Sequence, residues 1–317
     1  MLNTESYRAI EINAFGGIDQ LHYASKAVPI PGPGEALIAV RAAGVNPSDI
    51  LMRQGVFGGA LPRGLGSELS GVVLALGEVD RSWPHAPPAV ADEVVAFGAR
   101  AAYAELAILS QKKLAPRPPQ VDVLSGAALS LPGQTALTSL DETSVEASDL
   151  VLIHGASGAV GSLLVQLALS RGARVIGTGG ERSQAALARL GATPVLYGPG
   201  LAARVAEAAD GAAVTVSIDA AGTPESGELG AAVQEAGGRA VTLVPASEAS
   251  HGVRMIQAHM GRAYEARLLM GFASGELQLR THAWPFSDVP GAHRAQEARH
   301  RQGKIVLTMD NNPFLPS

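Results

Sequence analysis

The stretch DLVLIHGASGAVGSLLVQLALSRGARVIGTGGER, residues 149–182, decides the fold of this 317-residue chain. Residues 150–153 form a short apolar run, which predicts a strand buried on both faces of a parallel sheet. A glycine-rich turn follows, and apolar side chains then recur at helical spacing from Val160 to Leu167. Residues 174–178 supply a second strand. The order strand, glycine turn, helix, strand is typical of a nucleotide-binding unit.

The glycine turn has the spacing of a dinucleotide-binding fingerprint. Its A-x-G-x-x-G pattern uses small residues that let backbone amides approach a pyrophosphate, and the following helix points its positive N-terminus at the same place. We therefore predict cofactor contacts from six consecutive residues: Ala156, Ser157, Gly158, Ala159, Val160 and Gly161.

A membrane helix is the alternative for residues 151–170, because they contain no Asp, Glu, Lys or Arg and are long enough to cross a bilayer. Gly155, Gly158 and Gly161, together with His154, make a poor lipid-facing helix. Each of them has a place in the strand-turn-helix interpretation. We therefore expect no membrane span.

Composition bounds the class of protein. The chain is 47% hydrophobic and 17% charged, below the usual ~25%, which predicts a compact globular protein of about two domains. Its net charge is −5 with a pI near 5.9, and it has no block of Lys or Arg, so it lacks the electrostatic footprint of a nucleic-acid or membrane-surface protein. Aromatic residues are only 4% of the chain, which leaves few platforms for base stacking.

The chain contains no cysteine, which excludes disulfides, thiolate chemistry and Cys-ligated zinc. Its first 17 residues, MLNTESYRAIEINAFGG, lack the basic start and apolar run of a signal peptide. We expect a cytoplasmic protein.

The predicted secondary structure changes along the chain from strands alone to alternating helices and strands. Up to about residue 118, Gly/Pro turns separate strand-like segments, which predicts an irregular β-barrel. These segments are residues 7–13, 36–42, 69–76, 94–97 and 104–109, and residues 83–90 (WPHAPPAV) predict a proline-rich surface loop. Beyond residue 121, helices alternate with strands at residues 194–197, 213–219 and 239–244, as in a doubly wound parallel sheet. Residues 304–310 return to strand composition and are expected to rejoin the first domain.

Seven stretches resemble the zinc-free quinone oxidoreductase branch of the medium-chain dehydrogenase/reductase superfamily: AFGG at 14–17, PGPGEALIAVRAAGVNPSD at 31–49, LGSELSGVV at 65–73, DEVVAFG at 92–98, AAYAEL at 101–106, HGASGAVG at 154–161 and RQGKIVL at 301–307. The resemblance runs nearly end to end. It implies an α/β fold in which a GroES-like β-barrel catalytic domain, residues 1–118 and 276–317, surrounds a Rossmann NADPH-binding domain, residues 119–275. Family members are commonly homodimers or homotetramers, and we expect a homodimer.

The chain departs from its zinc-dependent relatives at the metal site. Where they place a Cys after Gly-Val, this chain has Asn46, and where they place His before Glu, it has Ser67. Their third ligand position corresponds to Leu131. Glu68 alone cannot hold a metal that needs three or four ligands. We expect no metal and zinc-independent catalysis.

The end of the second strand bears on the choice of cofactor. An NAD-preferring Rossmann site usually places Asp or Glu there to bind the ribose hydroxyls, but Gly179 holds that position. In related reductases a basic residue near this point contacts the 2′-phosphate, and the guanidinium fork of Arg182 suits that geometry. The alternative for Arg182 is a solvated helix residue. We expect NADPH.

The same resemblance assigns residues around the nicotinamide. It implies that Thr135 and the backbone at Val244 and Ala246 border the ring, and that Lys304 lies near the cofactor. Asn46 is expected to face the reacting carbonyl or the nicotinamide ribose, and its alternative role is to cap the Asn-Pro turn. Asn46 and Thr135 are the predicted catalytic residues.

The expected reaction is hydride transfer from the cofactor to a quinone or an α,β-unsaturated carbonyl, a small-molecule partner. An enoyl-thioester reductase is the enzymatic alternative, because residues 46–59 resemble that group. Thioester reductases place a tyrosine where Phe57 stands, and the quinone branch often has one where Leu51 stands, so we assign both residues to the substrate pocket. Phe57 packing against the pocket wall is its alternative role. An NADPH-binding structural or RNA-binding protein is the non-enzymatic alternative.

Overall fold

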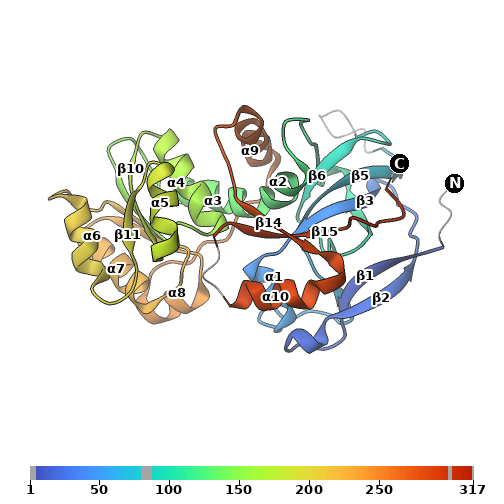
Figure 1. The fold of residues 1–317 in the computed structure, drawn as a ribbon, viewed down its shortest axis with the longest axis horizontal. Helices are drawn as coiled ribbons and strands as arrows, with labels where there is room; N and C mark the ends of the chain where they lie inside the picture. Colours follow the sequence, from blue (N-terminus) through green and yellow to red (C-terminus); the bar gives the residue numbers. More distant parts are fainter. Residues whose placement is uncertain (1–4, 80–87, 299–301, 316–317) are drawn as a thin grey trace.

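The computed structural model describes residues 5–79, 88–298 and 302–315, and among these residues the strands form three sheets (Figure 1). The predicted proline-rich loop at 83–90 lies mostly outside the described residues. A five-stranded sheet occupies one side of Figure 1 and the antiparallel sheets occupy the other, with α3 running between them.

The antiparallel part is built mainly from the N-terminal third of the chain. A three-stranded sheet has the order β2-β1-β4, and a seven-stranded sheet has the order β14-β15-β3-β5-β6-β8, with β7 paired to β3. The N-terminal strands and helices are β1 (Ser6–Ile12), η1 (Ile18–Gln20), β2 (His22–Ala27), β3 (Glu35–Gly44), α1 (Pro47–Arg53), β4 (Arg63–Gly64), β5 (Glu68–Leu76), β6 (Glu93–Phe97), β7 (Leu106–Ser110), η2 (Gln111–Lys113) and β8 (Leu114–Pro116).

The five-stranded sheet is wholly parallel and has the order β11-β10-β9-β12-β13. Its central strand β9 is the apolar run before the glycine turn, and the strand order reverses beside it, which is where doubly wound sheets bind ligands. The elements of this region are α2 (Val123–Ala128), α3 (Ser130–Glu142), β9 (Leu150–His154), α4 (Ala159–Ser170), β10 (Arg174–Gly179), η3 (Glu181–Ser183), α5 (Gln184–Arg189), β11 (Thr193–Leu196), α6 (Leu201–Ala209), β12 (Val216–Asp219), α7 (Pro224–Glu235), β13 (Arg239–Thr242), α8 (Pro245–His251) and α9 (Arg262–Ser274).

Strand β9 shows why residues 150–153 are all apolar. Val151 and Ile153 belong to the hydrophobic cluster on the α3 and α4 side of the sheet, whereas Leu150 and Leu152 pack with α6 on the other face. Alternate side chains of a strand point to opposite faces, so both faces need apolar residues when helices cover both. Each such buried Leu or Ile contributes roughly 1.5–3 kcal/mol.

The chain then returns to the antiparallel part through β14 (Thr281–Pro285), η4 (Phe286–Asp288), α10 (Val289–Glu297) and β15 (Lys304–Thr308). Strand β15 pairs antiparallel with β3 and parallel with β14. The C-terminal strand therefore joins the seven-stranded sheet built mainly from the N-terminal part of the chain, in agreement with the expectation that residues 304–310 rejoin the first domain.

We keep residues 118/119 and 275/276 as the proposed domain boundaries. Helix α2, which follows the first boundary, packs against β3 and β5 of the barrel, and one hydrophobic cluster joins Ala42 and Val95 to residues of α3 and α4. The two parts therefore share a continuous core at their junction.

One segment differs from the expected elements. The turn expected at Asn46 and Pro47 opens helix α1, because proline at the first helical position needs no amide partner and already has a helical φ. No helix of the described ranges is both long and apolar enough to cross a membrane.

Candidate active site

The glycine turn forms a cradle at the carboxyl end of β9. Gly155 has a φ of 68°, and a Cβ at Gly161 would stand 2.2 Å from the Gly155 carbonyl oxygen, so both positions require glycine. Gly158 is the N-cap of α4, and within the described chain neither a side-chain cap nor an acidic residue occupies this helix end. The free amides and the helix dipole suit a pyrophosphate, so the turn fits a dinucleotide.

The six residues predicted to contact the cofactor all lie in this cradle. Ala156 and Gly161 are buried and pack the turn against the sheet, whereas the other four are half-buried: Ser157, Gly158, Ala159 and Val160. The Ser157 carbonyl accepts a hydrogen bond of 3.0 Å from the Gly303 amide, which belongs to the segment leading into β15.

The second parallel strand ends at Gly179, which is buried. A Cβ at this position would lie 2.4 Å from Ser183 Oγ, so the acidic side chain of an NAD-preferring site would have to displace the Ser183 hydroxyl. Arg182 is exposed in the turn η3 that follows. An exposed guanidinium in the turn after β10, where the ribose of a dinucleotide would lie, has the chemistry to bind a phosphate.

Val244 and Ala246 lie where β13 passes into α8, with Val244 as the helix N-cap. The Val244 amide donates to Thr242 Oγ1 at 3.1 Å. Nearby, Asp219 Oδ1 accepts from the amides of Ala221 and Gly222, each at 2.9 Å, and so shapes the turn after β12. These backbone segments lie at the same sheet edge as the glycine turn.

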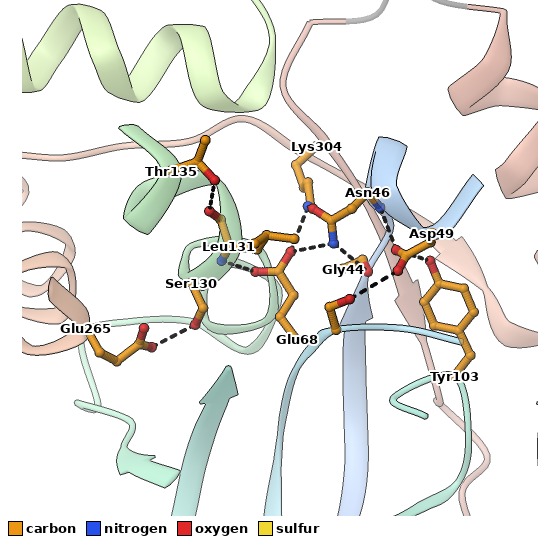
Figure 2. A network of polar contacts seen from close by, with 11 residues as sticks. Gly44, Asn46, Asp49, Glu68, Tyr103, Ser130, Leu131, Thr135, Glu265 and Lys304 are labelled. Carbon is orange, nitrogen blue, oxygen red and sulfur yellow. Dashed lines mark hydrogen bonds and ion pairs between the residues drawn. The ribbon is translucent and has the colours of Figure 1, made fainter. Parts of the chain in front are cut away.

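A buried polar cluster of Asn46, Glu68 and Lys304 lies at the start of β15 (Figure 2). Lys304 Nζ is 2.7 Å from Glu68 Oε1 and also donates to Asn46 Oδ1. Asn46 Nδ2 donates to Glu68 Oε1 at 3.0 Å and to the Gly44 carbonyl at 3.4 Å. Glu68 is 0%, Lys304 3% and Asn46 4% exposed, so this ion pair is shielded from water and satisfied by hydrogen bonds.

Helix α3 closes the cluster from the Rossmann side. The Leu131 amide donates to Glu68 Oε2 at 2.8 Å, and Thr135 Oγ1, one turn later, donates to the Leu131 carbonyl at 2.7 Å. Thr135 is half-buried, and Figure 2 shows it beside Leu131 on α3. Glu68 thus binds Asn46 and Lys304 directly, and it is linked to Thr135 only through Leu131.

A second buried carboxylate, Asp49, fixes the first turn of α1. Its Oδ2 accepts from the backbone amide of Asn46 and from the Tyr103 hydroxyl, both at 2.8 Å, and its Oδ1 accepts from Ser67 Oγ at 3.3 Å. Burial raises the pKa of Asp49, and burial together with Asp49 raises the pKa of Tyr103 well above its ordinary value. This carboxylate therefore fixes the backbone that carries Asn46.

A third buried carboxylate, Glu265 from α9, lies on the other side of α3. It accepts from Ser130 Oγ and from Gln134 Nε2, each at 2.7 Å. Burial raises its pKa to about 7, although these donors and Arg262 act in the opposite direction. Glu265 anchors the helix that carries Leu131 and Thr135.

The three positions that correspond to zinc ligands have other partners. The side-chain amide of Asn46 contacts Lys304 and Glu68, and the Ser67 hydroxyl donates to Asp49. Leu131 has an apolar side chain and contributes only its backbone amide. No group of three His, Asp or Glu side chains able to hold a metal occurs in residues 5–79, 88–298 or 302–315.

The two residues assigned to the substrate pocket are more open. Leu51 is half-buried within α1, and Phe57, which follows that helix, is 57% exposed. Phe15, also exposed, packs against Gly55, where a Cβ would stand 2.7 Å from the ring. This end of α1 therefore presents apolar surface to solvent.

Sequence reasoning missed the partners of these residues. Glu68 begins the mostly apolar strand β5, and a carboxylate buried at such a position needs a cationic partner, which is the signal that would have linked it to Lys304. Asp49, Tyr103 and Glu265 carry no comparable local pattern.

Two domain-family models match the chain: the alcohol dehydrogenase GroES-like domain over residues 32–119 and the zinc-binding dehydrogenase domain over residues 159–273. The quinone oxidoreductase of Pongo abelii is 35% identical to it over 193 residues, 59% of this chain and 57% of that protein. The chain belongs to the zinc-free quinone oxidoreductase branch of the medium-chain dehydrogenase/reductase superfamily. It spans little more than half the length of this curated relative.

Two further comparisons extend over nearly the whole chain. The spectinabilin polyketide synthase system protein NorB of Streptomyces orinoci is 30% identical over 318 residues, 93% of this chain and 14% of that protein. A mycobacterial protein solved in complex with NADPH has a TM-score of 0.78 and 29% identity, covering 95% of this chain and 99% of its own. The family and the fold class predicted from the sequence, a GroES-like barrel with a Rossmann domain, are confirmed.

Proposed function

We propose that this member of the quinone oxidoreductase branch is a zinc-independent, NADPH-dependent reductase that transfers hydride to a quinone or an α,β-unsaturated carbonyl. The observation that carries the proposal is the Asn46–Glu68–Lys304 cluster. It provides a buried cation next to Asn46, one of the three positions that correspond to zinc ligands in the zinc-dependent relatives. A fixed ammonium can stabilise developing negative charge on an oxygen, as a metal ion does in those relatives.

The bound nicotinamide would supply the hydride. The residues of this chain would orient the substrate and stabilise the negative charge that develops on its oxygen. Lys304 has three N–H donors, and Glu68 and Asn46 accept from this ammonium in the described chain. We assign a further donor to the reacting oxygen or to the nicotinamide ribose. The Asn46 amide hydrogens are already donated to Glu68 and Gly44, so Asn46 acts by orienting Lys304. Thr135, Val244 and Ala246 border the ring in this proposal.

NADPH is supported by two features of the strand end. Gly179 stands where an NAD-preferring site has the acidic side chain that binds ribose hydroxyls, and Arg182 is exposed in the turn that follows. The mycobacterial structure with NADPH bound shares the fold.

Arg182→Ala is expected to reduce the preference for NADPH over NADH by about 1.5–3 kcal/mol, because it removes hydrogen bonds to a charged 2′-phosphate. The measurement is kcat/KM with each cofactor at fixed acceptor concentration. Arg189→Ala, on the neighbouring helix α5, is the control and should leave the ratio unchanged. Equal kcat/KM with NADPH and NADH in the unmodified enzyme would contradict the proposed NADPH preference.

An enoyl-thioester reductase is the second candidate. It is favoured by the similarity of residues 46–59 to that group and by the match to a segment of a polyketide synthase system protein. NADPH oxidation measured against a panel of quinones, enones and enoyl thioesters separates the two candidates. We also propose that the enzyme is a cytoplasmic homodimer that acts on small molecules and has no nucleic-acid partner.

A further inference from the structure

Three consecutive residues, Gln302, Gly303 and Lys304, connect the barrel to both ends of the proposed cofactor site. Gln302 Nε2 donates to the Arg182 carbonyl at 2.7 Å. The Gly303 amide donates to the Ser157 carbonyl at 3.0 Å, and Gly303 forms a parallel bridge with Gly158. Lys304 joins the Asn46–Glu68–Lys304 cluster. One short segment thus contacts the turn after the second strand, the glycine turn and the active site.

The barrel holds Gln302 in place from its own side. Gln302 Oε1 accepts from Arg280 Nη1 at 3.1 Å, and the Gln302 carbonyl lies 2.7 Å from His282 Nε2. Gly303 has a φ of 77°, and a Cβ there would stand 2.0 Å from the Arg280 carbonyl oxygen, so the backbone at this point has essentially one arrangement. The Gln302 amide is therefore pre-positioned before it reaches Arg182.

The turn that carries Arg182 is the three-residue 3-10 turn Glu181–Ser183. Within its own domain, the Ser183 amide and Oγ donate to the Gly180 carbonyl at 2.9 and 2.7 Å, and Gln184 Nε2 donates to the Gly179 and Gly180 carbonyls at 2.9 and 3.2 Å. Gln302 contacts this turn from the other domain. Gln302 therefore helps to fix the backbone of Arg182, and the position of this backbone determines where the Arg182 side chain can reach.

We propose that Gln302 is a specificity-determining positioning residue, which holds the Arg182 carbonyl so that the guanidinium meets the 2′-phosphate of NADPH. The inference rests on the proposed NADPH dependence. A neutral hydrogen bond contributes modestly, and a bidentate guanidinium-phosphate contact tolerates little misplacement. Loss of the Gln302 donor should weaken NADPH binding about three- to tenfold and leave NADH binding nearly unchanged.

The test is calorimetric titration of the whole protein with NADPH and with NADH, which measures Kd without turnover. Gln302→Met keeps the side-chain length and removes the amide, and it should lower the NADH/NADPH Kd ratio three- to tenfold. Gln166→Met is the matched control, because Gln166 Nε2 also donates to a backbone carbonyl across elements, that of Gln278 at 2.9 Å. The control should leave the ratio unchanged.

A double variant tests whether Gln302 acts through Arg182. In an Arg182→Ala background, Gln302→Met should cause no further fall in the ratio, because the group that it positions is gone. Gln302→Glu, which places a carboxylate against the Arg182 carbonyl, is the second variant if Gln302→Met does not fold, and it should lower the ratio at least as far.

The outcomes separate this inference from the proposed function. Equal Kd values for the two cofactors in the unmodified protein would overturn the NADPH proposal and this inference with it. A clear NADPH preference that survives Gln302→Met, or a parallel loss of affinity for both cofactors, would overturn the inference alone. A further fall of the ratio in the Arg182→Ala background would show that Gln302 acts by another route and would also overturn it.

Discussion

Lys304→Met is expected to lower the free energy of unfolding by about 3–5 kcal/mol, because it leaves Glu68 as an unpaired charge in the core. Glu68 is fully buried and would retain only the Asn46 amide and the Leu131 backbone amide as donors. The same change should reduce kcat by about 10²–10³-fold, the cost of removing one donor to a developing oxyanion. Chemical unfolding and steady-state kinetics measure the two effects separately.

A double variant distinguishes stability from catalysis in this cluster. Lys304→Met combined with Glu68→Gln removes both charges and should recover most of the lost stability, whereas activity should stay low. Lys113→Met is the control, since Lys113 Nζ donates only to the Gly98 carbonyl among the contacts described, and it should cost at most about 1 kcal/mol. Full activity in the stable double variant would show that Lys304 has no role in the reaction.

Phe57→Tyr is expected to raise turnover of an enoyl thioester by about 10²-fold, the lower end of the range for a positioned general acid. Hydride addition to a quinone gives a stabilised hydroquinone anion that takes its proton from solvent, whereas a thioester enolate is more basic and gains more from a donor. The unmodified enzyme should therefore reduce quinones or simple enones faster than thioesters. The measurement is kcat/KM for one substrate of each class.

Phe15→Tyr is the matched control for this change, because Phe15 is a neighbouring exposed aromatic residue that packs on Gly55. It should leave thioester turnover unaltered. Comparable kcat/KM for thioester and quinone in the unmodified enzyme, with no gain from Phe57→Tyr, would contradict the assignment of a quinone or enone as substrate.

Much of the fold could be predicted from local sequence patterns. The strand β9 and the glycine turn could be predicted without long-range information. A strand buried on both faces requires a continuous apolar run, and a turn that excludes Cβ atoms requires glycine. Helix α1 was missed because Asn46 followed by Pro47 is equally typical of a turn, and seven residues show too little periodicity to decide.

The site was harder to predict because its interactions join distant residues. Lys304 and Asn46 are 258 positions apart, and Ser130 and Glu265 are 135 apart. A sequence pattern names polar residues in each segment, but only the pairing of β15 and β5 with β3 brings Lys304 and Asn46 to Glu68. Likewise, only the packing of α9 on α3 brings Glu265 to Ser130. The assignments of Asn46 and Thr135 stay predictions, and the structure adds Glu68, which binds Asn46 directly and is linked to Thr135 through Leu131.

The most direct test of the account is NADPH oxidation with a quinone acceptor before and after exhaustive dialysis against a metal chelator, together with elemental analysis of the dialysed protein. With Asn46, Ser67 and Leu131 at the ligand positions, we expect unchanged kcat/KM and no stoichiometric zinc. Loss of turnover on chelation that is restored by added zinc would contradict the central claim.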